Sequence, residues 1–360
     1  MARMNRDWRD IRQALAESVL IGDGAFGTQL HAAGLGPGDC AEEWNASRPD
    51  VVLGVTAAYV RAGSTVVSTN TFGGSALKLA AYGLAGRCEE FNEHAASLAR
   101  QAADGGQGHL IVGLPGDARA DLTPPAFGRS PSPPAERGCL SAAKAGVRLS
   151  ADTRHTAASE REATLCDGAF VVGSVGPCGR ILEPFGDTTG DEARESFARQ
   201  VRGLMAGGID GVLVETMFSL EEALAALAAA AEVAPGLPTF CTMTFQPEGR
   251  TSFGVSVDNA VAVLEAAGVA GVGINCGTGS EQALPMVERF CELASVPVIV
   301  QPNAGVPKLV AGKAVFDETP EVMAAQALRF RDAGARWIGG CCGSTPAHIR
   351  AMAEVLRGGS

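Results

Sequence analysis

The run FVVGSVGP (170–177), the stretch 192–206 and the run DGVLVETMF (210–218) decide the fold. The two outer runs are apolar and β-branched and end near glycine, threonine or acidic residues, which is typical of buried parallel strands. The stretch between them is rich in Ala and Glu, which favour a helix. Together they predict two parallel strands joined by a helix.

Six more runs of the strand type occur along the chain, and further helical stretches are predicted over 89–103, 220–233 and 281–293. The six runs are VLIGDGAFG (19–27), STVVSTNTF (64–72), PTFCTMTF (238–245), GVGINCG (271–277), PVIVQPNAG (297–305) and RWIGGCCGS (336–344). Eight parallel strands with intervening helices close naturally into a (β/α)8 TIM barrel. An open doubly wound sheet more often has about five to seven strands and an early glycine-rich phosphate turn.

One segment, 115–163, does not fit the repeat. Six of the 19 prolines lie within 115–134, and no sustained periodicity follows them. We interpret 115–163 as a long insertion before the third strand of a single barrel domain spanning 1–360. The alternative is a small regulatory or docking element that covers the site.

Composition excludes several classes of protein. With 46% hydrophobic and 19% charged residues, the 360-residue chain has enough apolar material for a large core, so it is not mainly disordered. A net charge of −11 argues against a nucleic-acid partner. The sequence has no apolar run of the ~18 residues that span a bilayer and no signal peptide at its start, so we expect a cytoplasmic protein without a membrane partner.

Three of the ten cysteines stand at predicted strand ends. Cys276 ends the sixth strand, and Cys341 and Cys342 follow the eighth between glycines. Barrel chemistry is carried by the carboxyl ends of the strands, so these thiols are expected at one rim. Adjacent residues of a regular strand point to opposite faces, and the flanking glycines allow the backbone to leave that geometry.

Thiolates are soft ligands that suit zinc, and three protein ligands leave the fourth tetrahedral position open for a substrate, as in catalytic sites. The five histidines lie outside the strand-end motifs, and no fourth cysteine follows at zinc-finger spacing. The residues therefore predict an open zinc site of Cys276, Cys341 and Cys342. The alternative is a pair of buried or oxidised thiols at 341–342 and an ordinary core cysteine at 276.

Zinc bound by three thiolates carries a net negative charge, so it activates water poorly but holds a fourth thiol in its deprotonated form. We therefore expect alkyl transfer to a substrate thiolate. A metal hydrolase would present His and carboxylate ligands at these strand ends. A noncatalytic zinc-binding or thiol-binding protein is the remaining alternative.

Seven motifs resemble the homocysteine S-methyltransferase family, and most closely the homocysteine-binding module of cobalamin-dependent methionine synthase. In chain order they are GDGAFGTQL, STNTFGG, VGSVGP, VETMFSLEEA, GINCG, QPNAG and GGCCGSTPAHI. The resemblance covers about Val19 to Leu356 apart from the insertion. It implies a zinc barrel that methylates homocysteine to methionine, with Cys276, Cys341 and Cys342 as the zinc ligands.

The resemblance also implies substrate contacts. Asp23 and Glu215 match the acidic residues that hold the amino acid's ammonium, and Thr69 matches a contact to its carboxylate. From the residues alone, the alternatives are that Asp23 caps a turn and that Glu215 pairs with a neighbouring base. Two carboxylates at the catalytic rim suit a zwitterionic substrate, because a buried ammonium needs compensating charge. Asn275, which ends the sixth strand, is predicted to contact the ligand or to fix a loop.

The methyl donor is left open. Betaine-using relatives carry an aromatic residue where this chain has Gly73, so betaine is disfavoured. Trp44 offers one aromatic wall for an onium donor such as S-methylmethionine or S-adenosylmethionine. In the synthase, folate and cobalamin modules follow the barrel, whereas only residues 357–360 follow the last predicted helix here, so we expect a separate corrinoid protein as the other candidate donor.

Overall fold

A computed structural model describes residues 10–105, 168–310 and 313–358. Within these residues, eight parallel strands form one sheet in the order β1-β10-β7-β6-β5-β4-β3-β2. The strands are β1 (Leu20–Ile21), β2 (Val66–Ser68), β3 (Phe170–Val175), β4 (Gly211–Met217), β5 (Thr239–Met243), β6 (Gly271–Gly279), β7 (Val298–Asn303) and β10 (Trp337–Ile338). Each contains or overlaps one of the eight predicted runs. The insertion predicted over 115–163 lies outside the described residues.

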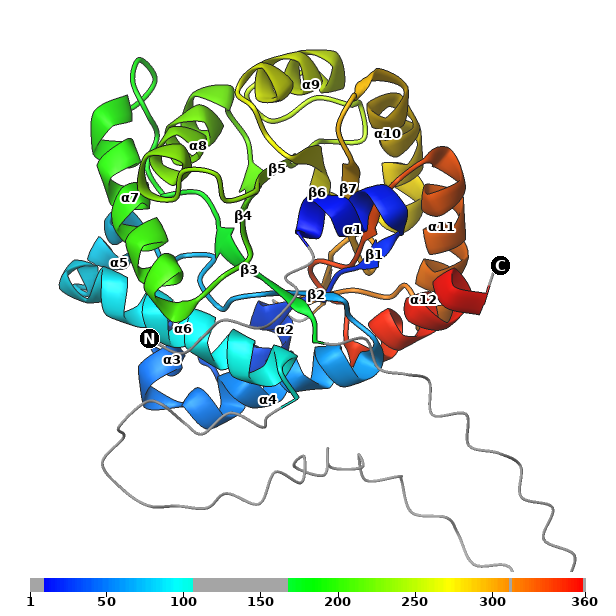
Figure 1. Cartoon of the computed structure of the whole chain (residues 1–360), viewed down its shortest axis with the longest axis horizontal. Helices are drawn as coiled ribbons and strands as arrows, with labels where there is room; N and C mark the ends of the chain where they lie inside the picture. Colours follow the sequence, from blue (N-terminus) through cyan, green and yellow to red (C-terminus); the bar gives the residue numbers. More distant parts are fainter. Residues whose placement is uncertain (1–9, 106–167, 311–312, 359–360) are drawn as a thin grey trace, which may run out of the picture. The chain divides into compact units, whose positions relative to one another are not determined.

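The sheet closes on itself, as Figure 1 shows. Its two edge strands, β1 and β2, approach each other where the backbone N–H of Thr65 donates a 2.8 Å hydrogen bond to the carbonyl of Ile21. The predicted (β/α)8 barrel is therefore confirmed.

The longer helices surround the strands (Figure 1). They are α4 (Pro49–Ala62), α6 (Cys88–Ala103), α7 (Gly190–Gly207), α8 (Leu220–Val233), α9 (Val257–Ala266), α10 (Ser280–Leu293), α11 (Pro320–Ala333) and α12 (Pro346–Gly358). Local sequence explains their ends. Thr189 and Glu192 form a capping box at the start of α7, and the left-handed Gly208 ends it. The four predicted helices correspond to α6, α7, α8 and α10.

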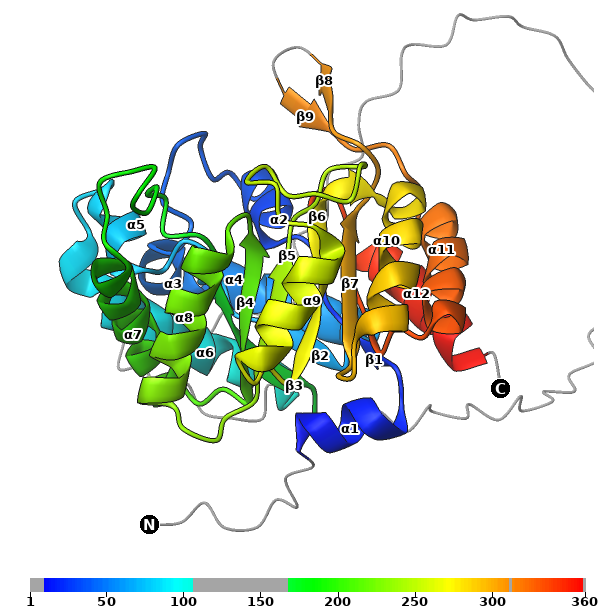
Figure 2. The same cartoon turned by 90° about the horizontal axis from the view of Figure 1, so that it is seen from above.

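The two ends of the barrel differ, as Figure 2 shows. At the amino end lies α1 (Ile11–Glu17), whose Ile11 and Leu15 pack with Phe240 and Trp337 in the barrel interior. The hairpin of β8 (Lys308–Val310) and β9 (Lys313–Val315) lies at the opposite end. Apolar side chains therefore close the amino end of the barrel. The functional groups of such barrels lie at the carboxyl end.

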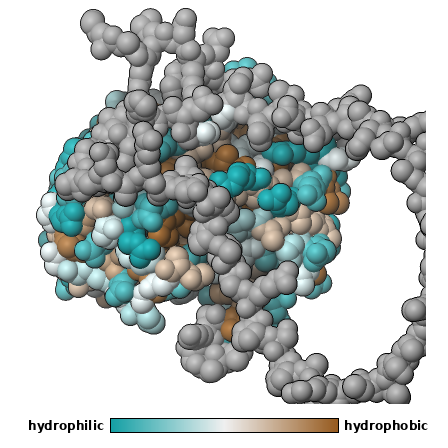
Figure 3. Space-filling model, turned by 90° about the horizontal axis from the view of Figure 1, so that it is seen from below, coloured by the Kyte–Doolittle hydropathy of each residue, from teal (hydrophilic) through white to brown (hydrophobic). Residues whose placement is uncertain are grey.

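Shorter elements complete the carboxyl end of the barrel. They are α2 (Phe26–Ala32), α3 (Trp44–Ser47), α5 (Ala76–Ala80) and the 3₁₀ helix η1 (Ala85–Arg87), all in the connections that follow β1 and β2. On the face shown in Figure 3, hydrophilic and hydrophobic residues are interspersed where the surface is not drawn grey. In the part of the chain that the structure describes, no helix has both the length and the apolar character needed to cross a membrane.

Candidate active site

The three rim cysteines lie together. The sulfur atoms of Cys276, Cys341 and Cys342 are all within 4.8 Å of one another, and the Cys276 and Cys342 sulfurs are 3.9 Å apart. All three residues are partly buried, and none forms a disulfide. This spacing is short enough for one ion to contact all three sulfurs, because zinc–sulfur bonds are about 2.3 Å long.

Cys341 and Cys342 lie in a turn directly after β10, not in the strand. The Cys341 N–H donates to the Pro302 carbonyl at 2.8 Å, and the Cys342 carbonyl accepts from the Ala304 N–H at 2.9 Å. Gly343 has a φ of 81°, and a Cβ at this position would lie 2.3 Å from the Cβ of Phe316. The turn therefore depends on glycine, which agrees with the expected departure from strand geometry.

Cys276 reaches the same place by a different route. Its φ is 57°, a left-handed conformation that non-glycine residues rarely adopt. The pairing of β6 with β7 shifts register between Asn275 and Gly279, and the Thr244 hydroxyl donates to the Asn275 carbonyl at 3.0 Å. This hydrogen bond fixes the peptide group that precedes Cys276. The sequence carried no sign of this strained cysteine.

The sulfurs interact electrostatically. Hydrogen bonds from the thiols of Cys341 and Cys342 lower the pKa of Cys276 well below its usual value, and the Asn303 side chain adds to this effect. The pKa values of Cys341 and Cys342 are raised, first because each interacts with the ionised Cys276. The cluster therefore holds one negative charge readily, and further ionisation needs a cation.

Asp23 is a buried carboxyl at the end of β1. It is 3% exposed, accepts the Ser68 N–H at 2.7 Å and accepts the Ser68 hydroxyl at 3.2 Å. Burial outweighs these hydrogen bonds and raises the pKa of Asp23 to about 7. The partner residue Ser68 was not singled out from the sequence, although it belongs to the STNTF motif.

Glu215 lies near the end of β4. Its carboxylate accepts hydrogen bonds from the Ser174 hydroxyl and, at 3.3 Å, from the Asn275 amide. Burial is the main reason that the pKa of Glu215 is raised to about 7; the Ser174 hydrogen bond lowers it, and the negative charges of Asp23 and Cys276 add to the rise. Asp23, Glu215 and the cysteine cluster therefore share one electrostatic environment.

Thr69 and Asn275 are buried within hydrogen-bond networks. Thr71 donates to the Ser174 carbonyl at 2.7 Å, so the 2.6 Å contact between the Thr69 and Thr71 hydroxyls uses the proton of Thr69. The Ser174 N–H donates to the Thr69 hydroxyl at 3.0 Å. A contact between Thr69 and a substrate carboxylate stays a prediction.

The residues considered for donor recognition already have partners within the chain. The guanidinium carbon of Arg48 lies 4.8 Å from the centroid of the Trp44 ring. The Gly73 N–H donates to the buried Glu42 carboxylate at 2.6 Å, and a Cβ on Gly73 would lie 2.9 Å from the same oxygen. An onium donor would compete with Arg48 for the Trp44 ring.

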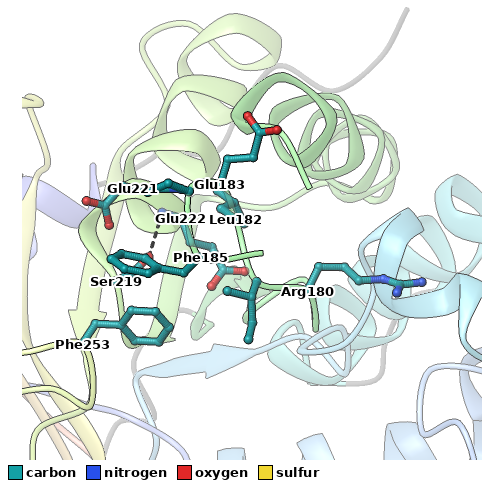
Figure 4. Close-up of a pocket in the computed structure, with 10 residues that line it drawn as sticks. Arg180, Leu182, Glu183, Phe185, Ser219, Glu221, Glu222 and Phe253 are labelled. Carbon is teal, nitrogen blue, oxygen red and sulfur yellow. Dashed lines mark hydrogen bonds between the residues drawn. The ribbon is translucent and has the colours of Figure 1, made fainter. Parts of the chain in front are cut away.

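A separate small pocket lies among the connections that follow β3, β4 and β5 (Figure 4). Phe185 and Phe253 line it and are exposed. Glu222, which also lines the pocket, accepts a hydrogen bond from the Cys178 N–H at 2.8 Å. None of the site residues predicted from the sequence lines this pocket.

The chain is similar to known proteins over most of its length. A family model described as homocysteine S-methyltransferase matches residues 20–356. The chain belongs to the homocysteine S-methyltransferase family. The expected resemblance is thus confirmed, and the family match extends over every strand of the barrel.

Besides the family model, curated relatives and solved structures are similar to this chain. The methionine synthases of Mycobacterium leprae and Mycobacterium tuberculosis are each 30% identical over 358 residues, which is 96% of this chain and 25% of theirs. The chain thus spans a quarter of the length of these relatives. Among solved structures, the oxidized form of the homocysteine methyltransferase MmuM from Escherichia coli is 22% identical to this chain, with a TM-score of 0.68. The match covers 96% of this chain and 99% of the MmuM chain. The metallated form of MmuM has the same score at 21% identity, and both support the fold.

Proposed function

We propose that this protein transfers a methyl group to the sulfur of homocysteine and so forms methionine, with zinc held by Cys276, Cys341 and Cys342. The observation that carries the proposal is the convergence of three sulfurs at the mouth of a barrel of this family. The buried carboxyl of Asp23 and the partly buried carboxyl of Glu215 lie in the same electrostatic environment and offer a place for a substrate ammonium.

The residues fit a zinc ion on grounds of their own chemistry. Three soft sulfur donors lie within 4.8 Å of one another, and their pKa values allow one negative charge unless a cation is added. Asn303, whose side chain contacts Cys276, has a buried amide oxygen without a hydrogen-bond partner among the described residues. A cation held beside that oxygen would compensate for the missing hydrogen bond.

Zinc bound here would lower the pKa of a substrate thiol from about 8.5, so that the thiolate predominates at neutral pH. The chain's own residues hold the rest of the substrate. Asp23 and Glu215 receive the ammonium, which compensates their negative charge in a buried setting. The thiol proton is released to solvent on binding. Transfer then forms the sulfur–methyl bond while the methyl–donor bond breaks, and that bond's electron pair leaves with the donor.

The donor is proposed to be a methylated corrinoid on a separate protein. What favours it is the resemblance of the motifs to the homocysteine-binding module of cobalamin-dependent methionine synthase, with which the 30% identity to two methionine synthases is consistent. A small onium donor, S-methylmethionine or S-adenosylmethionine, is the second candidate, and the Arg48 contact on Trp44 weighs against it.

The test is a donor screen with zinc-loaded protein and L-homocysteine. Each reaction receives S-methylmethionine, S-adenosylmethionine, or a methylcorrinoid protein, and methionine is measured by mass spectrometry. We expect methionine that depends on both the donor and the zinc. Zinc bound at one per chain with no methionine from any donor would leave the noncatalytic zinc-binding alternative.

A further inference from the structure

Thr216, the residue after Glu215, has a strained backbone. Its φ is 61°, and Thr216 and Cys276 are the non-glycine residues with positive φ in the described parts of the chain. A β-branched residue adopts this conformation only when its surroundings impose it. At the same place the pairing of β4 with β5 shifts register between Val214 and Met217.

The strained residue reverses the alternation of side chains along β4. Leu213 points into the barrel interior, whereas Val212 and Val214 belong to the core outside the strands. Regular alternation would keep Glu215 inside and would send Met217 inside as well. Met217 instead packs in the outer core. The bulge at Thr216 therefore leaves Glu215 at the mouth and removes the bulky Met217 from it.

The Asn275 side chain holds this bulge. Its Oδ1 accepts the Thr216 N–H at 2.8 Å and the Thr242 hydroxyl at 2.9 Å, and its Nδ2 donates to the Thr216 hydroxyl at 2.7 Å. The second Nδ2 proton goes to the Glu215 carboxylate at 3.3 Å. An amide offers two donors and two acceptor positions, so Asn275 has no capacity left for a ligand.

We propose that Asn275 is a positioning residue, which locks Thr216 in the left-handed conformation and so aims the Glu215 carboxylate at the substrate ammonium. This role rests on the proposed function for its choice of ligand. It differs from the substrate contact that the sequence predicted for Asn275, because the amide acts through Thr216 and Glu215.

The experiment compares two double variants that differ by a single methyl group. Asn275→Ala removes the lock, and Thr216 is then replaced by Gly or by Ala in that background. Glycine adopts a positive φ without strain, whereas alanine keeps the strain, and neither offers a hydroxyl. Binding of L-homocysteine and of 4-mercaptobutanoate, which lacks the ammonium, is measured by calorimetry on zinc-loaded protein. Thermal unfolding is measured on metal-free protein.

We expect Asn275→Ala to weaken homocysteine binding about tenfold and to leave 4-mercaptobutanoate within about twofold of the wild type. The N275A/T216G variant should recover most of the lost affinity and of the lost Tm, and N275A/T216A should recover neither. Equal behaviour of the two double variants would overturn the proposal, as would equal weakening of both ligands. A wild-type protein that binds homocysteine but yields no methionine counts against the proposed function alone.

If Asn275→Ala does not fold, Thr242 provides the same test more gently. Thr242→Val removes one hydrogen bond to the Asn275 Oδ1, and Thr242→Ser keeps it. We expect the Val variant to weaken homocysteine about threefold relative to the Ser variant, with 4-mercaptobutanoate unaffected. Identical homocysteine affinities for Val and Ser would overturn the role of the amide.

Discussion

The sulfur half and the carboxylate half of the mouth differ in what holds their functional groups in place. The sulfurs, at the ends of β6 and β10, are placed by unusual backbone conformations, namely a left-handed Cys276 and a turn that needs Gly343. The carboxyls of Asp23 and Glu215 accept hydrogen bonds from Ser68 and Ser174, and the left-handed Thr216 beside Glu215 is itself held by the Asn275 side chain. The backbone conformations hold the sulfurs close enough to share one metal ion. The hydrogen bonds compensate carboxyls that are removed from water and whose charge a ligand must balance.

The two halves also differ in what they lack. The cysteine cluster needs a cation before a second thiol ionises, and the carboxyls have their pKa values raised to about 7 by burial. Under the proposed function, a metal completes the first half and an ammonium completes the second. Variants in one half should therefore leave the ligand of the other half in place.

The largest effect is expected in the sulfur half. Replacing Cys276, Cys341 or Cys342 by Ala should abolish zinc binding and reduce methyl transfer by about a thousandfold or more, because two soft ligands do not retain the ion at catalytic geometry. Cys291→Ala, in α10 and also partly buried, is the matched control and should keep about one zinc per chain. Metal content by mass spectrometry checks both. Full turnover by a zinc-free variant would contradict the mechanism.

The backbone of the sulfur half is tested at Gly343. Gly343→Ala should lower the free energy of unfolding by about 3 kcal/mol, because strain from positive φ and a clash with Phe316 add together. Gly249→Ala shares a positive φ but meets open space, so about 1 kcal/mol is expected. Urea unfolding of both variants gives the difference. Equal losses would mean that Phe316 moves aside and that the turn tolerates a side chain.

Variants of the carboxylate half should lose affinity for homocysteine but keep the metal. Asp23→Asn and Glu215→Gln should each raise the KM for homocysteine about thirtyfold, because a charged hydrogen bond to the ammonium is replaced by a neutral one. Zinc content should stay at about one per chain. Loss of zinc from these variants would show that the two halves are one unit and would remove the contrast drawn between them.

The smallest effect concerns pH. Methionine has no thiol to titrate, so its binding to zinc-loaded protein reports the carboxyls. With the pKa of Asp23 at about 7, the carboxyl is mostly neutral at pH 6 and mostly charged at pH 8, so Asp23 should contribute about tenfold to the rise in affinity over this interval. Glu215, whose pKa is also about 7, contributes its own share, which remains in the Asp23→Asn variant. Calorimetry of the wild type and of Asp23→Asn at pH 6 and pH 8 checks whether the affinity for methionine rises with pH. A profile in the variant as steep as that of the wild type would assign the titration to another group.

Much of this arrangement was predictable from the sequence. The eight strands were located because each apolar run between helical stretches ends near a glycine, an asparagine, a threonine or an acidic residue. The glycines of GGCCGS (339–344) indicate a turn. Asp23 and Glu215 were predicted to hold the ammonium because the motifs GDGAFG and VETM that contain them resemble those of the family. In each case the signal lies within a few neighbouring residues.

Other features depended on contacts between distant segments. The left-handed backbones of Thr216 and Cys276 are imposed by Asn275 and Thr244, which are far away in the chain or on other strands. Local propensity disfavours both conformations, so no inspection of neighbouring letters predicts them. The sequence by itself determined which strands form the barrel and which atoms reach its mouth. Only the tertiary structure decided how those atoms are held, because strain at one strand is stabilised by hydrogen bonds from the next.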